Sequence, residues 1–264
     1  MNFLNPFRRG AKGAARASGP SGHRAYVIGD IHGRLDLLDQ LLEQIHREIE
    51  ERPPGKTLLV FLGDLIDRGP SSAQVIERLR TYRRDGVQPV FLAGNHEEVM
   101  LRVVHGDVDL LTNWLRFGGA ECLRSYGLDP LTIRTMRRSE AIEAIDRVVP
   151  GEHLDFLRSF SDSCRFGDYL FVHAGIRPGV ELELQRQSDL RWIREPFLAD
   201  DSDHGFVVVH GHTICDAVEE RNNRIGIDTG AYRSGVLTAL AIEGDQRWYL
   251  STEQQADAPI PPAH

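Results

Sequence analysis

Five clusters of polar residues, each placed directly after a short apolar run, constrain the fold of this chain more than any other feature. In order, AYVI precedes GDIHG, TLLVFL precedes GDLIDRG, QPVFLA precedes GNHEE, DYLFV precedes HAG, and GFVVV precedes HGHT. Short runs of this composition are typical of buried strands. Ligands of open α/β sheets bind at the carboxyl ends of the strands, so five polar strand ends predict one shared site.

The segments between the first strands carry apolar residues at helical spacing. A helix is predicted after the first strand by residues that recur three and four positions apart: Leu35, Leu38, Leu41, Leu42, Ile45 and Ile49. Val75, Ile76 and Leu79 predict a second helix after the second strand. The first hundred residues therefore have the order β-α-β-α-β, which favours a parallel sheet with helices on its faces.

The rest of the chain differs in character. Residues 97–165 are expected to be mostly helical, as an insertion. After them, DYLFV, GFVVV, RIGI, VLTALAI and RWYL follow at close spacing, which predicts a second sheet of mixed or antiparallel strands. The basic residues 1–22 and the proline-rich residues 252–264 are expected to be disordered tails. The folded domain is therefore predicted to span residues 23–251.

Charge and cysteine content argue against several classes of function. The formal net charge of −8 argues against nucleic acid as the main partner, because phosphate backbones bind basic surfaces. Cys122, Cys164 and Cys215 lie far apart without a C-x-x-C pair, so neither a disulfide framework nor a thiolate metal site is expected. We therefore expect a reducing compartment, the cytoplasm. We also expect no membrane span, because no apolar run is long enough.

The composition of the polar clusters indicates metal binding. Turns favour Asn, Asp and Gly but have no use for His, yet four of the five clusters contain histidine. Carboxylate, amide and imidazole ligands without thiolate suit Mn, Fe, Zn or Co. Five strand ends offer more donors than one ion needs. The set therefore indicates a two-metal site of the kind that clamps an in-line displacement at phosphorus.

In this order, the motifs G-D-x-H-G, G-D-x-x-D-R-G, G-N-H-E, H-A-G and G-H-T resemble the signature of the calcineurin-like metallophosphoesterases. LIDRGPSS, WIRE and IDTGAYRSGVLT resemble the serine/threonine phosphoprotein phosphatase branch, in particular the phage-lambda and bacterial protein phosphatases. The resemblance covers residues 24–243. It implies an α/β sandwich of two mixed β-sheets flanked by helices, with the metal site at the carboxyl ends of the strands.

The resemblance also implies the metal ligands. Six residues would hold two divalent ions: Asp30, His32, Asp64, Asn95, His173 and His212. The first two of these would bind one ion, the third would bridge both ions, and the last three would complete the second ion. Mn²⁺ is the ion that we expect, with Fe, Zn or Co as alternatives. His210 shares a strand face with His212 by alternation and could line the cleft.

Four further residues would act on the phosphate: His96, Asp67, Arg68 and Arg194. The resemblance implies that His96 is the general acid and that the carboxylate of Asp67 orients it and raises its pKa. Arg68 and Arg194 would bind the non-bridging phosphate oxygens. The segment DLRWIRE also offers Arg191 for this role.

These residues predict a metal-dependent phosphomonoester hydrolase in which a metal-bridging hydroxide attacks phosphorus in line. The expected partners are phosphoserine and phosphothreonine in proteins or peptides, with phosphotyrosine or a small phosphoester also open. Many phosphodiesterases of the wider superfamily carry G-H-x-H, whose second His is a ligand. Ile214 takes that place here, which favours a monoester.

Two alternatives stay open. A hydrolase of dinucleoside polyphosphates such as diadenosine tetraphosphate shares the fold and much of the signature. Trp114, Phe117 and Tyr126 would then be candidates to stack a base. A binding or scaffold protein on a phosphatase fold would have lost ligands, and every matched position is kept. The sequence assigns no role to the helical stretch of residues 100–165, which could form a lid or a substrate wall.

Overall fold

The computed structural model describes residues 17–252. Of the predicted disordered tails, residues 1–16 and 253–264 lie outside the described residues, whereas residues 17–22 and Thr252 lie within them. The first described residues contact the folded body, where the backbone N–H of Gly19 donates to the carbonyl of Gly244. The ordered body thus begins a few residues before the first strand.

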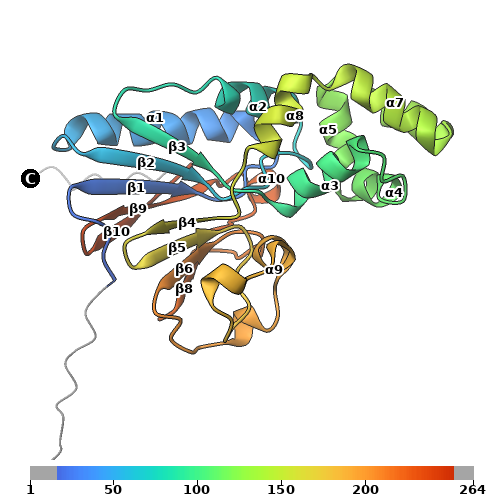
Figure 1. Cartoon of the computed structure of the whole chain (residues 1–264). Helices are drawn as coiled ribbons and strands as arrows, with labels where there is room; N and C mark the ends of the chain where they lie inside the picture. The colour runs from blue at the N-terminus through green and yellow to red at the C-terminus, as the bar shows by residue number, and fades with distance from the viewer. Residues whose placement is uncertain (1–16, 253–264) are drawn as a thin grey trace, which may run out of the picture.

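The first sheet combines parallel and antiparallel strands in the order β10-β9-β1-β2-β3 (Figure 1). β1 (His23–Ile28), β2 (Lys56–Phe61) and β3 (Val87–Phe91) run parallel, as the β-α-β-α-β pattern predicts. β9 (Thr238–Glu243) pairs antiparallel with β1, and β10 (Gln246–Ser251) pairs antiparallel with β9. The prediction that VLTALAI and RWYL belong to the second sheet is therefore wrong, because they complete the first.

The burial of β9 explains this placement. Ala239 and Ala241 face the core under the helices, whereas Leu240 and Ile242 face the second sheet, and all four side chains are buried. A strand that is apolar on both faces needs a covering layer on each side. The first sheet offers both layers, since helices cover one of its faces and the second sheet covers the other.

The second sheet has the order β4-β5-β6-β8-β7. β4 (Ser163–Phe166) pairs antiparallel with β5 (Tyr169–Val172). β5, β6 (Val207–His210) and β8 (Arg224–Gly226) run parallel, and β7 (Glu219–Glu220) pairs antiparallel with β8. The predicted mixed second sheet is thus confirmed.

Helices cover the outer face of the first sheet (Figure 1). α1 (Leu35–Glu51) and α2 (Ser72–Arg80) turn the predicted apolar positions toward the core, where all are buried except the half-buried Leu35 and Ile49. α8 (Gly151–Arg158) packs against α2. Six further elements form a helical arm, whose labelled parts lie beyond the sheet in Figure 1. They are α3 (Asn95–Val104), α4 (Leu111–Trp114), η1 (Leu115–Gly119), α5 (Ala120–Ser125), α6 (Pro130–Thr135) and α7 (Arg138–Val148). The short elements near the second sheet and the site edge are η2 (Leu182–Leu184), α9 (Gln187–Trp192), η3 (Phe197–Ala199) and α10 (Ala231–Ser234).

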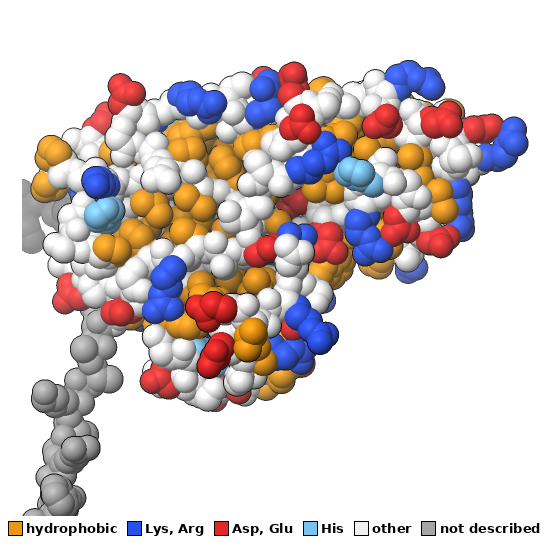
Figure 2. Space-filling view, in the orientation of Figure 1, with side chains coloured by type: hydrophobic (Ala, Val, Ile, Leu, Met, Phe, Trp, Pro, Cys, Tyr) orange, Lys and Arg blue, Asp and Glu red, His pale blue; other side chains and the backbone are white. Residues whose placement is uncertain are grey.

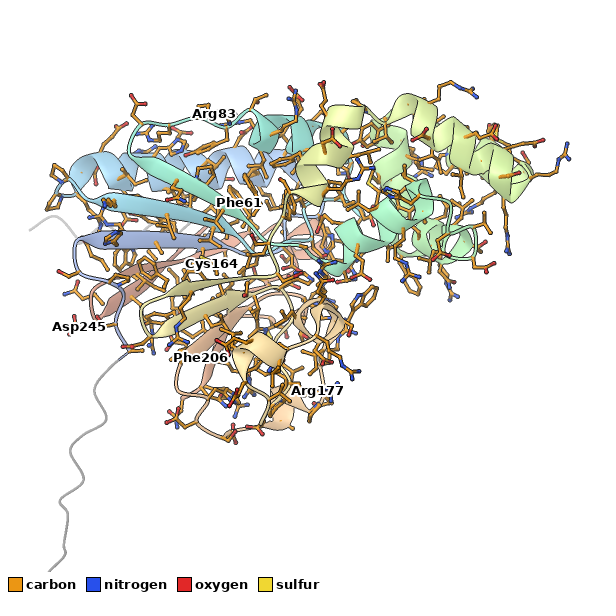
Figure 3. All side chains as sticks on the ribbon, in the orientation of Figure 1. Phe61, Arg83, Cys164, Arg177, Phe206 and Asp245 are labelled. Atoms are coloured by element: carbon orange, nitrogen blue, oxygen red, sulfur yellow. The ribbon has the colours of Figure 1, made fainter. Side chains whose placement is uncertain are left out.

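Apolar side chains fill three layers of core. Phe61 lies between the helices and the first sheet, Cys164 borders the layer between the two sheets, and Phe197 lies in the layer beyond the second sheet. Figure 3 labels Phe61 and Cys164 on their strands. The packing confirms the predicted sandwich of two mixed sheets flanked by helices.

The surface carries charges of both signs. Acidic and basic side chains are interspersed over the face shown in Figure 2. Within residues 17–252, no helix has the length and apolar character needed to cross a bilayer.

Candidate metal centre

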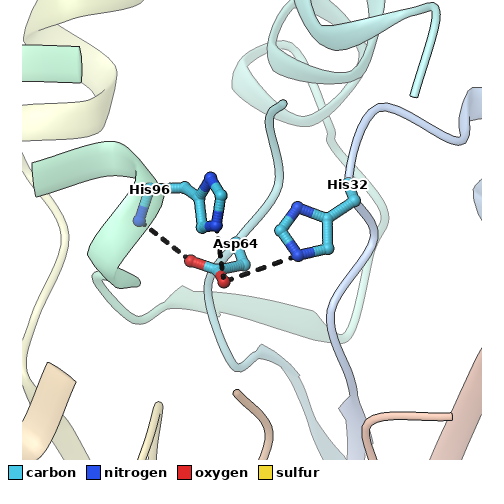
Figure 4. Close-up of side chains that lie close together, drawn as sticks. All are labelled: His32, Asp64 and His96. Carbon is cyan, nitrogen blue, oxygen red and sulfur yellow. Dashed lines mark hydrogen bonds and ion pairs between the residues drawn. The ribbon is translucent and has the colours of Figure 1, made fainter. Parts of the chain in front are cut away.

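Asp64, three residues after the end of β2, lies among the converging strand ends. Its Oδ1 atom lies 3.4 Å from Nε2 of His173. Its Oδ2 atom lies 3.5 Å from Nε2 of His32 and 3.9 Å from Nε2 of His96 (Figure 4). A carboxylate with imidazoles on two sides suits the bridging role predicted for Asp64.

Asn95, the first residue of α3, joins the ends of β5 and β6. Its Oδ1 atom lies 3.0 Å from Nε2 of His173 and 2.8 Å from Nδ1 of His212. The backbone N–H of His212 donates to Oδ2 of Asp30 at 3.0 Å. The fold thus brings all six predicted metal ligands, every one buried, into a single cluster.

Backbone carbonyls orient two of the imidazoles. Nδ1 of His32 lies 2.8 Å from the carbonyl of Ile66, and Nδ1 of His173 lies 2.9 Å from the carbonyl of Leu62. Each carbonyl fixes the proton on Nδ1, which leaves Nε2, the nitrogen on the side of Asp64, unprotonated. Metal-binding histidines in proteins are commonly oriented in this way.

The titration of the cluster suits cation binding. Burial lowers the pKa of His32 and His173, and burial together with His173 lowers the pKa of His212 to about 3. These imidazoles are therefore uncharged at neutral pH, and each has a nitrogen lone pair that can bind a metal ion. Burial opposes ionisation of Asp64, but the surrounding imidazoles hold its pKa below the ordinary value, so it remains a carboxylate.

Asp30 provides the test of whether the residues fit metal ions. Burial, then the neighbouring carboxylates of Asp228 and Asp64, raise the pKa of Asp30. Its Oδ1 atom is buried and has no hydrogen-bond partner within the described part of the chain. A divalent cation would supply that missing partner and relieve the repulsion between the carboxylates, so this donor set fits the predicted ions.

The backbone of the site is held in an unusual conformation. Positive φ angles occur at five non-glycine residues of the described chain, all of them in this site: His32 (46°), Asp64 (48°), Asp67 (71°), Arg68 (66°) and His212 (63°). Left-handed backbone costs a non-glycine residue about 1–3 kcal/mol and persists where the surroundings impose it. These residues lie in the turns after β1, β2 and β6, where the left-handed backbone directs their side chains toward the site.

Two glycines determine the positions of the carboxylates of Asp64 and Asp30. A Cβ atom at Gly94 would overlap Oδ1 of Asp64, and a Cβ atom at Gly211 would overlap Oδ1 of Asp30. No larger residue fits at Gly211 unless the carboxylate of Asp30 moves, and at Gly94 the backbone nitrogen of Asp64 would have to move as well. The glycines of GNHEE and HGHT therefore determine where the metal-binding oxygens lie.

His96 is held by two linked hydrogen bonds. Its Nδ1–H donates to Oδ2 of Asp67 at 2.7 Å, and the indole N–H of Trp114 donates to the same oxygen at 3.0 Å. Burial lowers the pKa of His96, but the carboxylates of Asp64 and Asp67 outweigh burial and raise it. His96 is therefore suited to carry a proton near neutral pH, as the general-acid role requires.

Replacing Asp67 with Asn should move the pH dependence of hydrolysis. The imidazolium of His96 loses a carboxylate partner, so its pKa falls and the acid loses its proton at a lower pH. We expect kcat to fall and the high-pH limb of the kcat profile to shift to lower pH. Steady-state kinetics from pH 5 to pH 10 would measure the shift, since acids and bases of the bound enzyme shape that profile.

Asp189→Asn is the matched control for this prediction. Asp189 is also buried and pairs with Arg177, whose position away from the site is labelled in Figure 3. Its replacement should leave the profile in place. An unshifted profile for Asp67→Asn would contradict the coupling of Asp67 to His96.

Arg68 connects the metal ligands to the general acid. Its NH1 lies 2.9 Å from Nε2 of His32 and its NH2 lies 3.1 Å from Nε2 of His96, while the guanidinium stacks 4.7 Å from the ring centre of Tyr232. A guanidinium donates to an imidazole nitrogen only when that nitrogen is unprotonated. A phosphate would offer anionic oxygens to the same donors, which would release both imidazoles.

The structure separates the two arginine candidates of DLRWIRE. Arg191 forms ion pairs with Asp162 at 2.6 Å and with Glu98 at 3.3 Å. Arg194 is exposed and lines the cleft beside the site, and within residues 17–252 it has no ion pair. Arg194 is therefore the arginine that is free to bind a phosphate oxygen.

A cleft of about 480 Å³ opens directly beside the metal ligands. Its described lining consists of Arg68, Asn95, His96, Val99, Leu110, Asn113, Trp114, Phe117, Trp192, Arg194 and His212. The helical arm contributes the apolar wall, so the stretch without a role in the sequence supplies one side of the cleft.

Tyr126 and His210, for which the sequence suggests roles at the cleft, do not line it. The hydroxyl of Tyr126 bonds to Nδ1 of His153 at 2.9 Å, and Tyr126 is not among the described lining residues, so it is not placed to stack a substrate base. His210 is buried with its ring centre 5.1 Å from that of Phe197 and does not line the cleft either. His210 is therefore a core residue, and Tyr126 is half-buried against the core.

Sequence reasoning missed three residues of the site. Glu97 accepts backbone N–H bonds from Asp64 at 2.9 Å and from two other residues of the adjoining turns. Asp228 neighbours Asp30, and Tyr232 lies 5.4 Å from the ring centre of His32. The sequence offered a signal for the last two, since DTGAY follows the run RIGI and is a sixth polar strand end, and Glu97 lies in the GNHEE cluster.

Comparison with known proteins gives a family match. The family described as "Calcineurin-like phosphoesterase" matches residues 23–233. Serine/threonine-protein phosphatase 2 of Escherichia coli (strain K12) is 30% identical over 83% of this chain and 92% of its own length. The symmetrical bis(5'-nucleosyl)-tetraphosphatase of Marinomonas sp. is 28% identical over 84% of this chain and 95% of its own.

Solved structures share the fold. The cold-active protein-tyrosine phosphatase of a Shewanella species covers 88% of this chain and 82% of its own, with 19% identity and a TM-score of 0.51. A metallophosphoesterase from Sphaerobacter thermophilus covers 88% of this chain and 89% of its own, with 16% identity and a TM-score of 0.52. At these identities the likeness concerns the fold alone.

Proposed function

The chain belongs to the calcineurin-like phosphoesterase family and is a metallophosphoesterase, and within that activity we propose that it hydrolyses phosphoserine and phosphothreonine in proteins or peptides. The proposal is based on the charge of the cleft. Apart from histidines, Arg68 and Arg194 are the cationic side chains among the described lining residues, and most of the wall is apolar. A substrate with one phosphoryl group and an uncharged leaving group suits this cleft. The additional phosphate groups of a polyphosphate would have no cationic side chain to pair with.

The residues divide the reaction between them. Arg68 and Arg194 hold the non-bridging oxygens of the phosphate and so orient phosphorus. His96 gives its Nε2 proton to the leaving oxygen, while Asp67 and Trp114 keep the imidazole in position. Two metal ions, when bound, supply the activated water and neutralise phosphate charge.

We propose Mn²⁺ as the metal, held by the six buried ligands described above. Carboxylate, amide oxygen and imidazole without thiolate form a donor set that suits Mn²⁺. We also propose a cytoplasmic location, which the three unpaired cysteines support.

A comparison of two substrates tests the proposed function. The value of kcat/KM is measured with Mn²⁺ for a phosphoserine peptide and for diadenosine tetraphosphate. We expect the peptide to be preferred. A clear preference for the dinucleotide would replace the proposal with the activity named for the Marinomonas relative.

Arg194→Gln should weaken substrate binding more than Arg191→Gln does. The first variant loses a cation of the cleft, and a charge-assisted hydrogen bond corresponds to roughly tenfold to a hundredfold in affinity. The second loses ion pairs outside the cleft. The KM for the phosphoserine peptide and the inhibition constant of inorganic phosphate measure both effects. A larger effect at Arg191 would exchange the two roles.

A further inference from the structure

A second cavity, of about 480 Å³, opens on the helical arm. It lies between residues 111–116, which form α4 and the start of η1, and residues 133–138, which join α6 to α7. We call it the arm groove. None of its described lining residues is a metal ligand or lines the cleft beside the metal centre, so the arm groove is a separate site.

The arm groove is basic, although the chain as a whole is acidic. Its described lining contains three arginines and no aspartate or glutamate, whereas the formal net charge of the chain is −8. Arg138 pairs with Asp109 at 2.8 Å. Within residues 17–252, Arg116 and Arg134 are exposed and have no ion pair. The arm groove therefore offers an anionic ligand two guanidinium groups that have no acidic partner.

The base of the arm groove is apolar. Leu111, Leu115 and Ile133 line it and are at most 4% exposed, whereas Met136 is 37% exposed. The packed residues give the groove a fixed base, and the flexible side chain of methionine suits surfaces that bind varied partners. A ligand that fits the arm groove therefore has anionic groups for the arginines and an apolar group for the base.

The composition of the lining favours a peptide over a nucleotide or a nucleic acid. None of the described lining residues of the arm groove is aromatic. Sites for single-stranded nucleic acid stack the bases on aromatic rings. A peptide needs no such ring, since its aspartate and glutamate side chains pair directly with arginine. The arm groove therefore has the composition of a site for an acidic peptide.

One helical segment separates the arm groove from the cleft beside the metal centre. Four residues at helical spacing line the cleft: Leu110, Asn113, Trp114 and Phe117. Four of their neighbours line the arm groove: Leu111, Thr112, Leu115 and Arg116. The two sets form two faces of the same segment. A helix is about 10 Å wide and an extended peptide advances about 3.3 Å per residue, so roughly four to six residues connect the two cavities.

We infer that the arm groove binds an acidic segment of a phosphoprotein substrate, about five residues from the phosphorylated side chain. The inference rests on the proposed function, because a polypeptide can extend from the cleft around the helical segment into the groove. Carboxylates of the segment pair with Arg116 and Arg134, and an apolar side chain contacts Met136 and the buried base. The groove thereby selects among phosphorylation sites by the residues that flank them.

The test compares phosphoserine peptides of equal length. One carries an acidic segment with a leucine about five residues from the phosphoserine, and the other carries serine and glycine there. The segment is placed before the phosphoserine in one pair and after it in a second pair. We expect the acidic peptide to have a kcat/KM about tenfold higher in at least one pair, the scale of one charge-assisted hydrogen bond. High salt should remove this preference, because it screens exposed charges.

Variants of the arm groove should lower the ratio of kcat/KM for the acidic and neutral peptides. Arg116→Glu and Arg134→Glu should each remove most of the preference, and Met136→Ala should lower it about threefold through a lost apolar contact. Arg147→Glu is the matched control. Arg147 is an exposed arginine of α7 that lies outside the described lining and has no ion pair within residues 17–252. This control should keep the ratio.

Direct binding separates the arm groove from the cleft. The probe is the acidic peptide without its phosphate, labelled with a fluorophore and titrated by fluorescence anisotropy. Arg134→Glu should lose this binding, whereas Arg147→Glu and Arg194→Gln should retain it. An equal loss in Arg194→Gln would place the acidic segment in the cleft and overturn the inference.

Three further results would overturn the inference. In the first, the unmodified enzyme hydrolyses the acidic and neutral peptides equally well. In the second, Arg147→Glu lowers the ratio as strongly as Arg134→Glu, which would reduce the effect to the overall charge of the arm. In the third, sedimentation shows a dimer that Arg134→Glu dissociates, which would assign the groove to a second copy of this chain.

Failure of the proposed function gives a different pattern. In that case the unmodified enzyme prefers diadenosine tetraphosphate over every peptide. Binding of the unphosphorylated acidic peptide then judges the arm groove alone. Binding that Arg134→Glu removes would still support a site for acidic peptides, and a lack of binding to the unmodified enzyme would reject it.

Discussion

Asp64→Asn is expected to abolish phosphatase activity and to loosen metal binding. The change removes one negative charge from the carboxylate that lies between His32 and His173, and Asn tolerates the left-handed backbone found at this position. We expect kcat/KM to fall by at least about a thousandfold, as when a central catalytic group is removed. Elemental analysis of the purified protein should find fewer metal ions per chain than in the unmodified protein.

Asp245→Asn provides the matched control for this prediction. Asp245 is an exposed aspartate in the turn between β9 and β10, far from the site (Figure 3). Its replacement removes the same charge and should change neither activity nor metal content. Near-normal activity of Asp64→Asn would rule out a bridging role for Asp64.

His96→Asn is expected to lower kcat by roughly a hundredfold to ten-thousandfold on a phosphoserine peptide, the usual contribution of a general acid. A serine alkoxide leaves poorly without a proton. The p-nitrophenolate ion leaves without one, so the loss on p-nitrophenyl phosphate should be much smaller. Rapid kinetic assays on the two substrates measure the difference.

Metal content separates two roles for His96. The ligand atoms of His32, Asp64 and His96 lie within 4.8 Å of one another, so proximity alone would allow His96 to bind an ion. The bond from its Nδ1 to Asp67 and its raised pKa favour the acid. His96→Asn should therefore retain its metal ions. Loss of metal together with equal losses on both substrates would assign His96 to the metal centre.

Much of the site could be predicted because its residues follow strands. A polar residue after a buried parallel strand has to lie at the carboxyl edge of the sheet, wherever it occurs in the sequence. GDIHG and GNHEE therefore meet although sixty residues separate them. Turn chemistry does not need histidine, so the histidines marked these strand ends as functional.

The remaining features depend on tertiary packing that the sequence pattern does not encode. β9 reads as one more strand of the second half, and its two-sided burial shows that it belongs in the first sheet. Trp114 has the spacing of a core residue, yet its N–H reaches Asp67 across 47 positions. Phe117 lines the cleft next to a break in the helix at Gly118, and no periodicity in the sequence predicts that break.

The left-handed backbone at the site determines which substitutions the fold accepts. At His32, Asp67 and His212, glycine keeps the required φ without strain and asparagine keeps it at small cost, whereas valine or isoleucine cannot adopt it. Glycine at these turns would relieve the backbone strain while removing the chemistry. Relatives that have lost hydrolysis should therefore carry glycine or asparagine at these positions and keep the sandwich intact. In such proteins a few substitutions would remove catalysis and leave the fold unchanged.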